Sequence, residues 1–150
     1  MERISYQELP EGMLSNLRRL EDFINSSPLE KTLVELVKLR ISQLNGCAYC
    51  VDMHYKELKH YKETELRLSS LVVWSETPYF TDKERVVLSF AETLTKLDSK
   101  PIQDAIYNPL TDHFSKSEIA FLVLAIAQIN TWNRLMKSFL FTPGNYEVTR

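Results

Sequence analysis

The chain has 150 residues, of which 44% are hydrophobic and 25% charged, ordinary values for a globular protein. Its net charge of −2 gives no general reason to expect a nucleic acid or an anionic membrane as partner. The N-terminus lacks the apolar core of a signal peptide, and the longest apolar run, residues 119–127, is far shorter than the roughly 20 residues of a membrane helix. We therefore expect a cytoplasmic protein.

Apolar residues recur at helical spacing through most of the sequence, whereas strand-like alternation is scarce. This pattern predicts an all-α fold, a single-domain helical bundle over residues 1–150. The expected helices cover about residues 12–24, 28–45, 47–61, 64–74, 81–97 and 115–139. We expect one short helix at most between Pro101 and Pro109, and a loose tail over residues 142–150.

Three segments carry the serine or threonine followed three residues later by glutamate that is typical of a capping box. Each predicts the start of a helix. Between the second and third expected helices, Asn45-Gly46 predicts a stop, because glycine readily adopts the left-handed conformation of a helix C-terminus. The three boxes are Ser27–Glu30, Thr81–Glu84 and Ser115–Glu118.

The only two cysteines of the chain, Cys47 and Cys50, are followed by His54. On a helix that begins near Cys47 these residues occupy positions i, i+3 and i+7, which form one stripe on one face. The first turn of a helix stabilises an anion, and the thiolate is the reactive form of cysteine. His54 lies one turn after Cys50, where it can take up or return a proton.

Three roles for the cysteines are open: a disulfide staple, a metal site and a redox-active dithiol. Structural disulfides are rare in the cytosol, and a chain of this length does not need one. Zinc could use both cysteines and His54, with Glu35 as fourth ligand, but the second Cys/His pair usual in structural zinc sites is missing. A haem attachment site needs histidine directly after the second cysteine, where Val51 stands. A redox-active dithiol is the favoured interpretation.

Glu35 is the candidate partner of His54. If the helices on either side of Asn45-Gly46 pack roughly antiparallel, Glu35 and His54 lie opposite each other, and the small Ser42 shares the face of Glu35. A carboxylate among Leu and Val residues is out of place without a partner. The alternative is that Glu35 is exposed or pairs with Lys31 or Lys38.

The other candidate residues are expected to be mainly structural. His60 and His113 are interpreted as surface or structural histidines. Trp74, Tyr79 and Phe80 are expected in the core, although they could also form an apolar wall beside a thiolate. Asn130, Asn133 and Arg134 are expected to take part in helix packing or subunit contacts.

Glu35, a gap of eleven residues, and then Cys47-x-x-Cys50-x-x-x-His54 resemble the active-site signature of the alkylhydroperoxidase D-like proteins. These belong to the carboxymuconolactone decarboxylase superfamily. The resemblance extends more loosely over about residues 30–136, and the motif-bearing core covers about residues 28–140. Some peroxidases of the family carry histidine between the cysteines, where this chain has Ala48-Tyr49. Decarboxylases of the superfamily generally lack the CxxC.

The resemblance implies an all-helical homo-oligomer, built from trimers or dimers, that needs no metal or organic cofactor. It implies a thiol peroxidase in which Cys50 attacks a hydroperoxide, Cys47 resolves the sulfenic acid to a disulfide, and His54 and Glu35 relay protons. A dithiol protein or a small thiol would then reduce the disulfide. The rival interpretation is a non-enzymatic redox sensor or oligomeric scaffold that is switched by the same disulfide.

Overall fold

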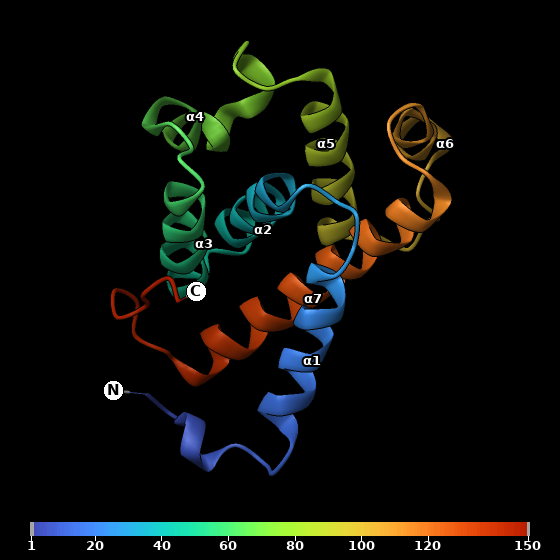
Figure 1. The fold of residues 1–150 in the computed structure, drawn as a ribbon. Coiled ribbons are helices and arrows are strands. Elements are labelled where there is room, and N and C mark those ends of the chain that lie inside the picture. Colours follow the sequence, from blue (N-terminus) through green and yellow to red (C-terminus); the bar gives the residue numbers. More distant parts are fainter. Residues whose placement is uncertain (1, 150) are drawn as a thin grey trace.

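The computed structural model describes residues 2–149, and every regular element in that range is a helix. The all-α prediction is therefore confirmed (Figure 1). The described residues form seven α-helices: α1 (Met13–Asn25), α2 (Lys31–Asn45), α3 (Ala48–His60), α4 (Glu65–Ser70), α5 (Asp82–Lys96), α6 (Asp104–Tyr107) and α7 (Lys116–Phe139). Three 3-10 helices lie between or before them: η1 (Tyr6–Glu8), η2 (Leu71–Glu76) and η3 (Asn108–Asp112).

Two of the three predicted capping boxes are confirmed. Thr81 opens α5 with Glu84, and Ser115 opens α7 with Glu118, each with both reciprocal hydrogen bonds. The prediction at Ser27 is wrong, because α2 begins at Lys31 and Glu30 is its N-cap residue.

The residues just before α2 make contacts outside the predicted box. Leu29 is buried before the helix begins. The Glu30 carboxylate accepts a hydrogen bond from Lys83 on α5 at 2.8 Å, and so does not return to Ser27. The remaining helix boundaries agree closely with expectation, except that the expected 64–74 helix divides into α4 and η2, and that η3 follows α6 directly.

Helix α7 is the central element of the core and packs against α1, α2, α3 and α5 (Figure 1). This helix has 24 residues and so extends well beyond the apolar run of residues 119–127. By length and composition alone it could cross a membrane. In this fold its buried side chains, including Leu122, Ile126 and Ile129, complete the main hydrophobic cluster with α2 and α5. The core helix of a soluble domain has the same composition.

The turn between α2 and α3 places the two helices that carry the predicted site side by side. Gly46 ends α2 in the left-handed conformation with φ of 63°, as predicted for Asn45-Gly46. Cys47 follows at once as the N-cap of α3. The chain therefore reverses within two residues, and the face of α2 that carries Glu35 meets the face of α3 that carries His54.

Candidate functional site

Cys47 and Cys50 are joined by a disulfide at the N-terminus of α3, with their Cα atoms 5.3 Å apart. The sulfur of Cys47 also accepts a hydrogen bond from the backbone N–H of Cys50 at 3.4 Å, and so satisfies one of the free N–H groups of the first helical turn. Both side chains are buried, with exposed fractions of 1% and 2%. The cysteines are thus close enough to interconvert between dithiol and disulfide.

The disulfide packs on the C-terminal part of the chain. Met136 of α7 and Phe141 form a buried cluster with the two cysteines, and Tyr49 and Trp132 contact this cluster at its edge. The aromatic rings of Phe141 and Tyr49 meet edge to face, with centroids 5.8 Å apart. Sequence reasoning missed Met136 and Phe141, which lie near the cysteines only because α7 crosses beneath α3.

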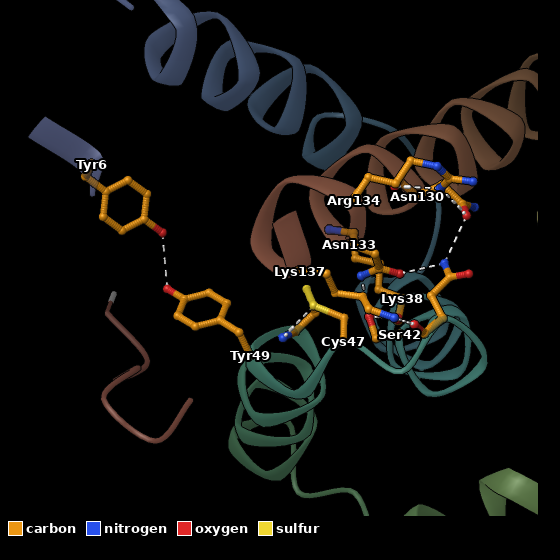
Figure 2. Close-up of a disulfide and its surroundings, with 11 residues drawn as sticks. Tyr6, Lys38, Ser42, Cys47, Tyr49, Asn130, Asn133, Arg134 and Lys137 are labelled. Atoms are coloured by element: carbon orange, nitrogen blue, oxygen red, sulfur yellow. Dashed lines mark hydrogen bonds between the residues drawn. A yellow bond between two sulfur atoms is a disulfide. The ribbon is translucent and has the colours of Figure 1, made fainter. Parts of the chain in front are cut away.

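An amide network fixes α7 against the turn before Cys47 (Figure 2). The side chain of Asn45 donates to Asn130 at 3.0 Å and to Asn133 at 2.8 Å, and Asn133 donates to Ser42 at 3.1 Å. Arg134 donates to Asn130 at 3.0 Å. The prediction that Asn130, Asn133 and Arg134 serve helix packing is confirmed within this chain, and Ser42 provides the close approach expected of it.

Glu35 and His54 meet across the α2–α3 interface. The Nδ1 atom of His54 lies 2.7 Å from Oε2 of Glu35. Burial alone would raise the pKa of Glu35, but the charge and hydrogen bond of His54, and then those of Lys38, lower that pKa to about 2. An ionised carboxylate only accepts hydrogen bonds, so Nδ1 is the donor and Nε2 remains available to other groups.

Lys38 is the second partner of Glu35. Its ammonium lies 3.2 Å from Oε1 of Glu35 and 3.0 Å from Oε2 of Glu21 on α1. Burial would lower the pKa of Lys38, but the two carboxylates outweigh burial and raise it. The two interpretations of Glu35, as partner of His54 or of Lys38, are therefore both correct.

A cavity of about 820 Å³ opens beside these groups. Among the described residues that line it are Cys50, His54, Glu35 and Lys38, but not Cys47. Aromatic side chains form much of the remaining wall, namely Tyr6, Tyr49, Tyr61, Trp132 and Tyr146. The cavity therefore gives a small molecule access to Cys50 and His54, while Cys47 stays behind them.

Both ends of the described chain contribute to this cavity. The hydroxyl groups of Tyr6 and Tyr49 lie 3.3 Å apart (Figure 2). Tyr146 donates a hydrogen bond to Glu57 on α3, and Lys56 donates to the carbonyls of Gly144 and Tyr146, each at 3.0 Å. The prediction of a loose tail is therefore wrong, because residues 144–146 are bound to α3, as the return of the chain towards α3 in Figure 1 illustrates.

Several residues considered from the sequence lie elsewhere. Phe80 is buried in a separate cluster with α2 and α4, and Trp74 packs against that cluster, as expected of core residues. The core prediction is wrong for Tyr79, which is exposed, and none of the three lines the cavity as an apolar wall. His60 and His113 are exposed on the surface. Within residues 2–149, no group of three or more His, Cys, Asp or Glu side chains is arranged to hold a metal ion.

Comparisons with known proteins agree with this geometry. The sequence model of the carboxymuconolactone decarboxylase family matches residues 12–93, a range that includes Glu35, Cys47, Cys50 and His54. The uncharacterized protein YdfG of Bacillus subtilis is 38% identical over 135 residues, which cover 89% of this chain and 91% of YdfG. Tyr6, Trp132 and Tyr146 lie outside the family match.

Two solved structures share the fold. ATU0492 of Agrobacterium tumefaciens, described as a protein of unknown function and a candidate antioxidant defence protein AhpD, has a TM-score of 0.91 at 36% identity and covers 97% of this chain and 100% of its own. The alkylhydroperoxidase AhpD core of a peroxidase-related protein from Ralstonia eutropha has a TM-score of 0.77 at 22% identity, over 87% of this chain and 70% of its own. The chain therefore belongs to the carboxymuconolactone decarboxylase family, as an alkylhydroperoxidase D-like member.

Proposed function

We propose that this protein is a thiol-dependent peroxidase that reduces organic hydroperoxides with the Cys47–Cys50 dithiol. The observation that carries the proposal is that Cys50 and the Glu35–His54 pair line one cavity, while Cys47 lies behind Cys50 within disulfide distance. A peroxidase of this kind needs a nucleophile open to substrate, a base beside it and a second thiol that substrate cannot reach.

In the first step Cys50 is the nucleophile. His54 takes the proton of the Cys50 thiol, and the thiolate sulfur attacks the terminal oxygen of the hydroperoxide. The O–O bond breaks, and the leaving alkoxide receives the proton back from His54. Cys50 is oxidised to a sulfenic acid, and the hydroperoxide is reduced to an alcohol.

In the second step Cys47 attacks the sulfur of the Cys50 sulfenic acid. The S–O bond breaks, the disulfide forms, and hydroxide leaves as water with the proton of the Cys47 thiol. Two thiols of a dithiol protein or of a small reductant then return two electrons and two protons, which restores the dithiol and leaves the reductant as a disulfide. The cycle uses residues of the chain, a hydroperoxide and a thiol.

In this scheme Glu35 orients the base, His54, and stabilises its protonated form. Its hydrogen bond to Nδ1 fixes one tautomer of His54, so that Nε2 is the nitrogen that exchanges protons with the dithiol, directly or through one water. The carboxylate also stabilises the protonated ring that forms when Cys50 ionises. This role is the one that the sequence resemblance implies for the pair.

The cavity favours an organic hydroperoxide over hydrogen peroxide. Its volume of about 820 Å³ lies within the range of drug-sized ligand pockets, and five aromatic side chains supply apolar wall. We propose that the protein acts in the cytoplasm as a homo-oligomer. The proposed cycle involves no membrane and no nucleic acid.

Steady-state consumption of cumene hydroperoxide by purified protein tests the proposal. Thioredoxin-type dithiol proteins and small thiols would be supplied in turn as reductants. We expect many turnovers per chain with at least one reductant, and none in Cys50→Ser. Oxidation that stops after one hydroperoxide per chain with every reductant would instead favour the redox sensor or switched scaffold.

A further inference from the structure

Lys38 is a buried lysine for which the proposed cycle has no role. Its side chain is 5% exposed, and it lies one turn after Glu35 on α2. A buried ammonium is costly unless carboxylates or other acceptors surround it, so its presence calls for a physical reason. Lys38 also lines the cavity that contains Cys50 and His54.

The contacts of Lys38 form one continuous chain of hydrogen bonds across four helices. The indole N–H of Trp132 on α7 donates to Oε1 of Glu21 at 3.0 Å, and Lys38 donates to Oε2 of the same carboxylate at 3.0 Å. Lys38 donates next to Oε1 of Glu35 at 3.2 Å, and Oε2 of Glu35 faces His54 at 2.7 Å. Each carboxylate is thus held through both oxygens, with Lys38 between them.

We propose that Lys38 is a positioning residue for the dithiol: held by Glu21, it fixes the Glu35 carboxylate towards His54 and shares the negative charge of that carboxylate with the histidine. The inference rests on the Glu35–His54 pair of the proposed function. Without Lys38, the whole charge of Glu35 would act on His54 and hold its proton more tightly. With Lys38 in place, part of that charge is offset, so the ring can be neutral before it takes the proton of the Cys50 thiol.

The other charged groups around His54 set the background to this effect. Those that line the same cavity are Arg18, Glu21 and Asp22 of α1, Lys31 of α2 and Glu57 of α3. Lys38 differs from Arg18 and Lys31 because it is buried and directly bonded to the partner of His54, whereas these two are exposed. Its charge is therefore screened least by solvent.

The test is the NMR titration of His54 in the disulfide form, in which no thiol titrates. The chain has three histidines, so the ring resonances of His54 can be assigned with His60→Gln and His113→Gln variants. We expect the midpoint to rise by about one pH unit in Lys38→Met, because loss of a cation favours protonation of its neighbours. Glu21→Gln should move the midpoint in the opposite direction, because Lys38 then acts on Glu35 alone and an anion is lost.

Two further variants make the outcome decisive. Arg40→Met is the matched control, because Arg40 is a partly buried cation of the same helix that pairs with Glu92 on α5 at 2.7 Å, outside the cavity. It should leave the midpoint unchanged. Glu35→Gln should lower the midpoint by breaking the pair itself.

If Glu35→Gln lowers the midpoint while Lys38→Met and Glu21→Gln leave it at the parent value, the inference about Lys38 is overturned and the Glu35–His54 pair stands. Lys38 is then a structural ion pair that affects only thermal stability. If Glu35→Gln also has no effect, the relay of the proposed function fails together with the inference. Because Glu21 is partly exposed, Glu21→Gln keeps the test open even if Lys38→Met does not fold.

Discussion

The Nδ1 atom of His54 lies 2.7 Å from Oε2 of Glu35, across the interface that the Gly46 turn creates between α2 and α3. The two residues are 19 positions apart in the sequence, and only the reversal at Gly46 brings them together. Cys50, one turn before His54 on α3, lines the same cavity. This arrangement makes the reactivity of the thiol depend on a residue of the neighbouring helix.

Glu35→Gln should slow the alkylation of the reduced protein by iodoacetamide at neutral pH by roughly tenfold. The neutral amide no longer stabilises protonated His54, and a histidine without its proton no longer stabilises the Cys50 thiolate. His54→Ala should slow the reaction further.

The measurement is the alkylation rate from pH 5 to 10. Glu92→Gln is a matched control, because Glu92 is a similarly shielded carboxylate bonded to Arg40 and Trp74 on the far side of α2. Coincident curves for parent, Glu35→Gln and His54→Ala would show that neither residue acts on the dithiol.

The same carboxylate makes stability depend on pH. The pKa of Glu35 falls to about 2 in the folded protein, from 4.5 in an unfolded chain. A depressed carboxylate pKa stabilises the fold fully above the unfolded value, and the contribution is lost as the pH falls from about 4.5 through about 2. The loss should amount to about 1 to 3 kcal/mol. Urea unfolding of parent and Glu35→Gln between pH 7 and pH 2 measures it. Parallel declines in the two proteins would refute this prediction.

The two cysteines should respond differently to replacement. In Cys47→Ser the sulfenic acid on Cys50 has no resolving thiol, so treatment with one equivalent of hydroperoxide should leave a species that dimedone labels. In Cys50→Ser the remaining thiol lies outside the cavity and should label weakly. Mass spectrometry of the tryptic peptide measures both. Stronger labelling of Cys50→Ser would reverse the roles of the two cysteines.

Removal of residues 143–150 should open the cavity. The tail is held by hydrogen bonds from Lys56 to the carbonyls of Gly144 and Tyr146, and Tyr146 itself lines the cavity. We expect bulky maleimides to react several-fold faster with the shortened, reduced protein, while iodoacetamide changes little. Tyr146→Phe, which keeps the ring and loses the bond to Glu57, is the control. Equal acceleration of both reagents would indicate general loosening of the fold.

The exposed side chains of α4 and η2 are consistent with a homo-oligomer. Leu66, Val72 and Val73 are 55%, 51% and 48% exposed, although they are large and apolar. We expect light scattering to give a multiple of the 17.5 kDa chain mass, and Val72→Asp to lower the measured mass. A mass near 17.5 kDa across a wide concentration range would contradict this expectation.

Local patterns and long-range contacts differed in how well the sequence predicted them. The boxes at Thr81 and Ser115 were predicted correctly because both partners lie within one turn. The box at Ser27 did not form, since Glu30 is itself the N-cap of α2 and its carboxylate bonds Lys83, a residue 53 positions away. The position of Glu35 opposite His54 could be predicted because one short turn joins their helices.

The remaining parts of the site depend on contacts for which the sequence carries no local signal. Tyr6 and Tyr146 reach the cavity from opposite ends of the chain, and Trp132 bonds Glu21 over 111 positions. The burial of Lys38 likewise requires Glu21 from another helix. From the local sequence alone, Lys38 would be interpreted as a surface charge, because its partner Glu21 belongs to α1.

The central claim is that this fold makes Cys50 react with hydroperoxides, and the rate of that reaction tests it most directly. Reduced protein would be mixed with cumene hydroperoxide, and the loss of thiols followed in time beside a reduced peptide of residues 44–54. The account predicts that the protein loses two thiols for each hydroperoxide consumed, at least a hundredfold faster than the peptide, which corresponds to about 2.7 kcal/mol of transition-state stabilisation. Equal rates for protein and peptide would contradict it, because the cavity and the Glu35–His54 pair would then contribute nothing to the chemistry.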